Sequence, residues 1–228
     1  MANWTKYLSA AALPVLLLGT AAIAQTQQQY AQPQYQGQPL QVAFTDPANV
    51  PNDLARIDNA LNGTASFSGR FTQYGADGSV SSGQIFLNRP GKMRFEYDAP
   101  NPLLIVSDGV TLTQVDKALE TSDRVPLSAT PLNYFLKENV KLERDTEVIG
   151  LTKNSAEISV TAQDGSGEID GAITMVFDAP SMNLKAWSIA DSFGGETRVL
   201  LSNLKYNQRL DPRLFVLRDD SRRDRRRR

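Results

Sequence analysis

The sequence predicts a mainly β domain, in which one large antiparallel sheet of about ten strands is accompanied by two short amphipathic helices. From residue 64 onward, apolar and polar residues alternate over segments such as 67–72 and 93–97, which is the period of a half-buried strand. Turn residues recur about every ten positions, as in an antiparallel meander. Two other segments have the apolar spacing of a helix.

Turn residues divide the alternating part of the chain into strands. Asp108-Gly109 joins the segments 103–107 and 110–115 and is among the strongest short hairpin signals. Further strands are expected over the ranges 146–151, 156–162, 172–178, 184–191, 196–206 and 214–217.

The two helices are expected near residues 52–62 and 131–139. Asn52 or Asp53 can cap the first helix, which Gly63 ends, while Thr130 followed by a proline is a typical start for the second. Their apolar residues recur at helical spacing: Leu54, Ile57 and Leu61 in the first helix, and Leu132, Phe135, Leu136 and Val140 in the second.

Composition limits the chemistry. The chain of 228 residues is long enough for one full-sized domain. It contains no Cys and no His, which excludes disulfides, thiolate nucleophiles and histidine bases. No nucleophile–base pair is evident, so we expect no enzymatic activity. Residues 25–217 carry 16 basic against 22 acidic side chains, which disfavours nucleic-acid binding.

The first 24 residues have the three-part pattern of a signal peptide. Lys6 precedes an apolar run at 10–24 that ends in Ala22-Ile23-Ala24. A retained membrane anchor is the alternative, but about fifteen residues interrupted by Pro14 are short for a bilayer core of ~30 Å. We expect cleavage before Gln25 and a mature protein outside the cytoplasm.

Both flanks of the domain are polar. Residues 25–41 contain nine Gln, which predicts a disordered linker over 25–51. Residues 218–228 form an Arg-rich tail with seven Arg. The tail either contacts anionic lipid headgroups or is simply solvated.

Residues 52–217 must bury the apolar face of a large sheet. Two short helices are a small cover for that face, so either the sheet closes on itself or it wraps around an apolar cavity. The loop 164–171 has alternating oxygen-bearing side chains like a calcium loop, but Met175 stands at the twelfth position, where calcium requires Glu. We therefore predict a polar turn and no metal.

Four stretches resemble the LolA family of outer-membrane lipoprotein carriers. The longest is F-T-Q-Y-G-A-D-G-S-V-S-S-G-Q-I-F-L-N-R-P-G-K-M-R-F-E-Y at 71–97; the others are V-S-D-G-V-T-L at 106–112, T-P-L at 130–132 and L-F-V-L at 214–217. The resemblance covers about residues 53–217. Phe95 is a departure, since the family usually has Trp there.

The resemblance implies a half-open antiparallel β-barrel of about 10–11 strands, with two lid helices enclosing an apolar cavity. It also implies a periplasmic chaperone for acylated outer-membrane lipoproteins. The implied partners are an inner-membrane ABC-type lipoprotein release complex and, where one exists, an outer-membrane lipoprotein receptor. We expect a monomer without cofactor. A periplasmic regulatory protein that senses lipid or lipoprotein on the same half-barrel is the alternative.

The expected site is a lined cavity with a latch. The cavity wall is assigned to Phe67, Phe71, Ile85, Leu87, Met93, Phe95, Tyr97, Leu104 and Val106, and the lid to Leu54, Ile57, Leu61, Leu132, Phe135 and Leu136. By alternation Arg89 shares a face with Ile85 and Leu87, where a charge must be hydrogen-bonded. Its guanidinium can bind lid carbonyls, which is the role that the resemblance also implies. The alternative is an Arg at the end of a strand whose side chain reaches solvent.

Overall fold

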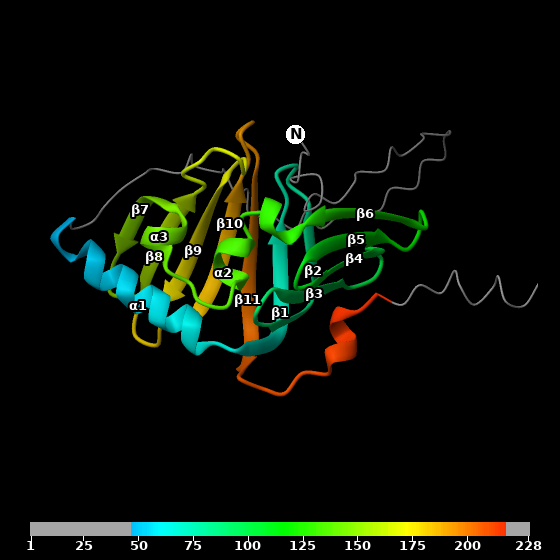
Figure 1. The fold of residues 1–228 in the computed structure, drawn as a ribbon. Coiled ribbons are helices and arrows are strands. Elements are labelled where there is room, and N and C mark those ends of the chain that lie inside the picture. Colours follow the sequence, from blue (N-terminus) through cyan, green and yellow to red (C-terminus); the bar gives the residue numbers. More distant parts are fainter. Residues whose placement is uncertain (1–46, 218–228) are drawn as a thin grey trace, which may run out of the picture.

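A computed structural model describes residues 47–217, which form one antiparallel sheet of eleven strands with few helices (Figure 1). The strands are β1 (Ser66–Tyr74), β2 (Val80–Asn88), β3 (Lys92–Tyr97), β4 (Leu103–Asp108), β5 (Thr111–Asp116), β6 (Thr121–Pro126), β7 (Glu147–Lys153), β8 (Glu157–Gln163), β9 (Ala172–Asp178), β10 (Leu184–Ala190) and β11 (Glu196–Tyr206). The mainly β prediction is confirmed, as is the hairpin around Asp108-Gly109.

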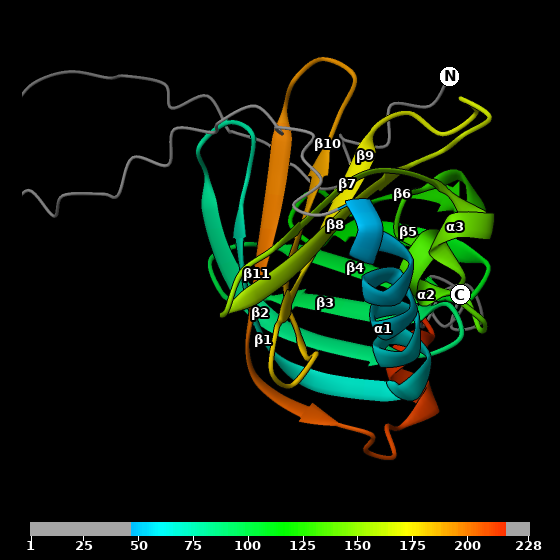
Figure 2. The same cartoon turned by 90° about the vertical axis from the view of Figure 1, so that its left-hand side faces the viewer.

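The sheet consists of two meanders joined at one pairing. Its strand order is β6-β5-β4-β3-β2-β1-β11-β10-β9-β8-β7, so every neighbour is also next in sequence except β1 and β11. Their pairing runs from Phe67↔Tyr206 to Tyr74↔Arg198. The outer strands β6 and β7 do not pair, and the sheet curls into a half-open barrel (Figure 2).

Helix α1 (Val50–Gly63) covers part of the concave face (Figures 1 and 2). It begins before the predicted 52–62, because Pro51 needs no hydrogen-bonded N–H in the first turn. A 3₁₀ turn, Pro47–Asn49, precedes it, so the end of the predicted linker 25–51 is helical. Leu54, Ile57 and Leu61 are buried, as predicted.

The second predicted helix, 131–139, is wrong in length. The segment between β6 and β7 contains a 3₁₀ turn Leu127–Ala129 and two four-residue helices, α2 (Asn133–Leu136) and α3 (Leu142–Asp145). The Thr130 hydroxyl donates to the Leu127 carbonyl of the preceding turn, 2.8 Å away, rather than capping a new helix. Helix α2 ends because Lys137 is extended.

The strand predicted at 214–217 is also wrong. Residues Pro212–Phe215 form a 3₁₀ helix, η4, in which the Asp211 side chain accepts a hydrogen bond from the Arg213 N–H. Arg94 of β3 donates to the Leu214 carbonyl over 3.2 Å, and Phe215 is buried. Strand β6 was not predicted, because its residues are mostly exposed and polar and show no alternation.

Three predicted segments lie wholly or mostly outside the described residues. They are the predicted signal peptide at 1–24, the predicted Gln-rich linker at 25–51, of which residues 25–46 are not described, and the Arg-rich tail at 218–228.

At Gly83 of β2 the neighbouring strands leave no room for a side chain, which supplies a stability prediction. A Cβ atom there would lie 2.2 Å from the Glu96 carbonyl oxygen and 2.6 Å from Phe71 Cε1. We expect Gly83→Ala to lower the free energy of unfolding by about 1–3 kcal/mol, since strand β3 must shift. Urea denaturation followed by Trp187 fluorescence measures the change.

Gly63→Ala is the matched control, because a Cβ atom at Gly63 meets nothing within 4 Å. It is expected to keep or raise stability, by up to about 1 kcal/mol. Equal losses in both variants would contradict the close approach at Gly83.

Candidate functional site

The concave face of the sheet is a continuous apolar wall. Phe67 pairs with Leu87, which pairs with Met93, and in the next row Ile85 pairs with Phe95. Paired residues of antiparallel strands point to the same face, so these side chains lie together, and all five are buried.

Aromatic rings connect the two meanders with the lid. Phe71 packs edge-on against Phe95 and Tyr97, with ring centroids 4.8 and 5.0 Å apart. Phe95 in turn meets Trp187 of β10 at 5.9 Å, and Trp187 meets Phe135 of α2 at 5.5 Å. Aromatic pairs at these separations stabilise a core beyond simple burial.

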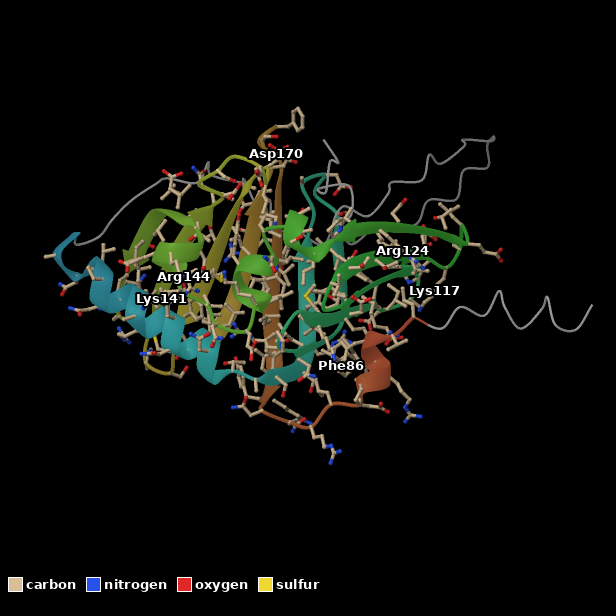
Figure 3. The ribbon with its side chains drawn as sticks, viewed as in Figure 1. Phe86, Lys117, Arg124, Lys141, Arg144 and Asp170 are labelled. Atoms are coloured by element: carbon tan, nitrogen blue, oxygen red, sulfur yellow. The ribbon has the colours of Figure 1, made fainter. Side chains whose placement is uncertain are left out.

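Polar contacts hold α1 to the lid segment 127–146. The Asn62 side chain donates to the Val140 carbonyl and accepts from the Val140 N–H, both over 2.9 Å. The buried Asp58 accepts from the Leu142 N–H over 3.1 Å and lies 3.2 Å from Lys141 Nζ. Lys141 and Arg144 are labelled beside α1 in Figure 3.

Arg89 bridges the two parts of the lid. Its guanidinium donates to the Leu61 carbonyl at the end of α1 and, over 2.5 Å, to the Lys137 carbonyl that follows α2. Its Nε is buried without a partner. Burial lowers the pKa of Arg89 to about 10, so it stays charged near neutral pH.

The turn after Arg89 also contacts the lid. The Gly91 N–H donates to the Leu136 carbonyl over 2.8 Å. Gly91 has a φ of +71°, and a Cβ atom there would lie 2.7 Å from Gly109 Cα, so only glycine fits. The Leu136 and Lys137 carbonyls, which no helical N–H satisfies at the end of α2, thus bond this turn instead.

A small cavity lies beside Arg89. It measures about 20 Å³, and its wall includes Leu61, Phe67, Phe135 and Tyr206. That volume holds about one water molecule and is far too small for a lipid acyl chain. In this closed form the lid's own side chains cover the apolar wall.

Comparison with known proteins identifies the family. Residues 62–218 match the family described as outer membrane lipoprotein carrier protein LolA. The chain belongs to the LolA family.

The chain is also similar to individual known proteins. An outer-membrane lipoprotein carrier protein of Pseudomonas paraeruginosa is 26% identical over 178 residues, which cover 72% of this chain and 82% of that protein. One from Chromobacterium violaceum is 29% identical over 171 residues, with the same coverage. Among solved structures, a LolA superfamily protein of Nitrosomonas europaea aligns with a TM-score of 0.44 and 11% identity, covering 73% of this chain and 97% of that one.

Seven of the nine residues predicted to line the cavity of this LolA-family protein belong to the core over the concave face. They are Phe67, Phe71, Ile85, Leu87, Met93, Phe95 and Tyr97. The predicted lid residues Leu54, Ile57, Leu61, Leu132, Phe135 and Leu136 are buried in the same core.

Leu104 and Val106, which were predicted to line the cavity, lie on the opposite, outer face of the sheet. They pair with Glu96 and Arg94, whereas Phe95 of the concave face pairs with Ile105. Strand β4 is buried on both sides because η4 covers its outer face, so its apolar run has no alternation from which to choose the side. Leu103 and Ile105 take their places in the core.

Sequence reasoning missed the contribution of the second meander. Trp187, Met175 and Phe177 are buried in the same core, and each lies on a strand that the alternation did predict. The alternation that placed Ile85 and Leu87 on one face also places these residues on one face of their own strands. Only the pairing of β1 with β11 shows that this face continues the concave wall.

Among residues 47–217, no helix is long and apolar enough to cross a membrane. In the same part of the chain, no three potential metal-ligating side chains gather into a group.

Asp145 supplies a pH prediction for the lid segment. Its side chain is 8% exposed and lies 2.8 Å from both Arg144 Nε and Lys137 Nζ. Burial acts to raise the pKa of Asp145, but the hydrogen bonds from Arg144 and Lys137 outweigh it and lower the pKa from 3.8 to about 2.

Because the pKa of Asp145 is lower in the folded state, its stabilisation is present above about pH 4 and is lost as pH falls toward 2. We expect the free energy of unfolding to fall about 2 kcal/mol more between pH 6 and pH 2 in the wild type than in Asp145→Asn. Urea denaturation at both pH values measures this difference. Asp123→Asn, at an exposed carboxylate on β6, should keep the wild-type decline; an equal decline in Asp145→Asn would contradict the prediction.

Proposed function

We propose that the protein is a periplasmic chaperone that binds the acyl chains of lipoproteins released from the inner membrane and carries them to the outer membrane. The observation that carries the proposal is the apolar concave wall beneath a lid held by a few polar contacts. Membership of a family of lipoprotein carriers supports the same cargo. The proposal assigns no catalytic residue to the chain.

In this mechanism cargo enters only when the lid moves, because the closed cavity holds about one water molecule. Moving α1 and α2 away from the wall exposes the apolar side chains of both. An acyl chain placed between them restores that burial, at roughly 0.8 kcal/mol for each CH₂. No polar recognition of the chain is required, so lipoproteins with different protein parts can be carried.

Arg89 acts as the latch of the closed form. A hydrogen bond from a charged donor contributes about 1.5–3 kcal/mol, so its two lid bonds amount to roughly the burial of four to eight methylenes. This is less than one lipid acyl chain offers. Cargo binding can therefore break the two lid bonds, and their re-formation favours cargo release. The buried, unpartnered Nε of Arg89 lowers the stability of the closed form.

Native mass spectrometry of the protein purified from its own periplasm tests the function. A bound acylated lipoprotein is the expected result, with a larger loaded fraction in Arg89→Leu. Protein that is free of lipid in both forms, and that associates only with a membrane regulator, would contradict the carrier and favour the sensing alternative.

Arg89→Leu is expected to separate loading from release. The variant loses the two lid bonds and gains apolar surface, so the loaded form is favoured twice over. A triacylated lipopeptide should still load, but its transfer to acceptor vesicles should slow about tenfold or more. Trp187 fluorescence follows loading, since Trp187 contacts Phe135 of the lid.

Two variants serve as controls for this experiment. Arg89→Lys keeps the charge but lacks the two-pronged donor, so its release rate should lie between those of the wild type and Arg89→Leu. Arg70→Leu removes an exposed arginine that pairs with Asp98, a kind of contact with little effect, and should release at the wild-type rate. If Arg89→Leu releases the lipopeptide at the wild-type rate, Arg89 has only a structural role and the latch is contradicted.

A further inference from the structure

Three turns of neighbouring hairpins lie at the end of the sheet remote from Arg89 (Figure 1). In Figure 2 one of them, the β8–β9 turn, bends away from the other two toward α3. The pair Tyr74↔Arg198 places the β1–β2 turn (75–79) next to the β10–β11 turn (191–195). The pair Ala190↔Ala172 places the β8–β9 turn (164–171) on its other side. We call these three turns the distal end.

Phe193 stands at the tip of the distal end. Its side chain is 83% exposed, more than any other large hydrophobic residue in the described chain. Burying an aromatic ring of this size would be strongly favourable, and within residues 47–217 no element covers it.

The turn that carries Phe193 is built to hold it in place. The Asp191 carboxylate accepts from the Phe193 N–H over 2.9 Å and from the Gly195 N–H over 2.7 Å. The Asp191 N–H donates to the Gly195 carbonyl over 2.8 Å. Gly195 also lies against Ala76 of the neighbouring turn. A hydrophobic side chain on a preorganised loop loses little entropy on binding.

The three turns of the distal end are acidic, although Arg144 of the lid segment lies beside the β8–β9 turn and Arg198 pairs with Tyr74. The segments 75–79, 164–171 and 191–196 contain six carboxylates and no Lys or Arg: Asp77, Asp164, Glu168, Asp170, Asp191 and Glu196. Asp170 is labelled at this end in Figure 3. Hydrogen bonds from Ser79 and Ser166 lower the pKa values of Asp77 and Asp164 respectively, so both carry charge at neutral pH.

We propose that Phe193 anchors a protein partner that offers an apolar socket rimmed by Lys or Arg side chains. The exposed ring supplies the central contact of such an interface and the carboxylates its polar rim. A membrane surface fits less well, because anionic lipid headgroups repel six carboxylates. Phe193 lies at the end of the sheet remote from Arg89, so this contact does not occupy the Arg89 latch, although the β8–β9 turn itself adjoins the lid segment at Arg144. The inference goes beyond the proposed carrier function.

Photo-crosslinking in the source organism tests the contact. A photoreactive phenylalanine replaces Phe193 in one strain and Leu119 in another; Leu119 is 60% exposed on the β5–β6 turn. We expect one discrete protein adduct from position 193 and not from 119. The crosslinked peptide should contain apolar residues flanked by Lys or Arg.

Binding of the identified partner to purified variants completes the test. Phe193→Ser should weaken binding about tenfold or more. Asp77→Lys combined with Glu196→Lys should slow association and reverse its salt dependence. No adduct above the Leu119 background, or binding unchanged in Phe193→Ser, would overturn the proposal.

A lipid anchor is the competing outcome. If the wild type, but not Phe193→Ser, binds vesicles of phosphatidylethanolamine and phosphatidylglycerol, the protein-partner proposal is wrong. Loading of a triacylated lipopeptide, read from Trp187 fluorescence, should be the same in Phe193→Ser and the wild type. That readout separates failure at the distal end from failure of the carrier function.

Discussion

The pairing of β1 with β11 is the interaction on which the rest of the molecule depends. Each meander alone would be an open sheet with one apolar face. Joined at Phe67↔Tyr206 through Tyr74↔Arg198, the two meanders form one curved wall, and their outer strands β6 and β7 are left apart. A concave apolar face with unpaired edges must be covered, and the segment between β6 and β7, together with α1, provides the cover.

The cover combines two kinds of contact that respond differently to cargo. Leu61, Phe135 and Leu136 contribute burial, which an acyl chain can replace methylene for methylene. Asn62, Asp58 and Arg89 contribute hydrogen bonds between α1, the lid segment and the β2–β3 turn, which an acyl chain cannot replace. In the proposed carrier mechanism, the apolar contacts give way to cargo with little loss of burial, while the polar contacts set how strongly the empty protein recloses.

The two ends of the sheet differ in chemistry. At one end Arg89 and Gly91 meet the lid through backbone carbonyls. At the distal end, Phe193 is carried on one of three turns that contain carboxylates accepting backbone hydrogen bonds. A partner bound at Phe193 would therefore not compete with the lid carbonyls for Arg89, although the β8–β9 turn adjoins the lid segment at Arg144.

The sequence by itself determined most strands, the existence of α1 and the face on which Arg89 lies, because alternation and helical spacing are local properties of the chain. Only the tertiary structure decided the rest. The pairing of β4 with β3 makes Leu104 and Val106 face outward. Because η4 buries that outer side, β4 is apolar on both faces and has no alternation from which the face could be predicted. Helix α2 ends at Leu136 because Lys137 is extended, and there the Leu136 and Lys137 carbonyls bond Gly91 and Arg89, which are more than forty residues away. Contacts between distant segments compete with local preference, and local patterns cannot report which of the two prevails.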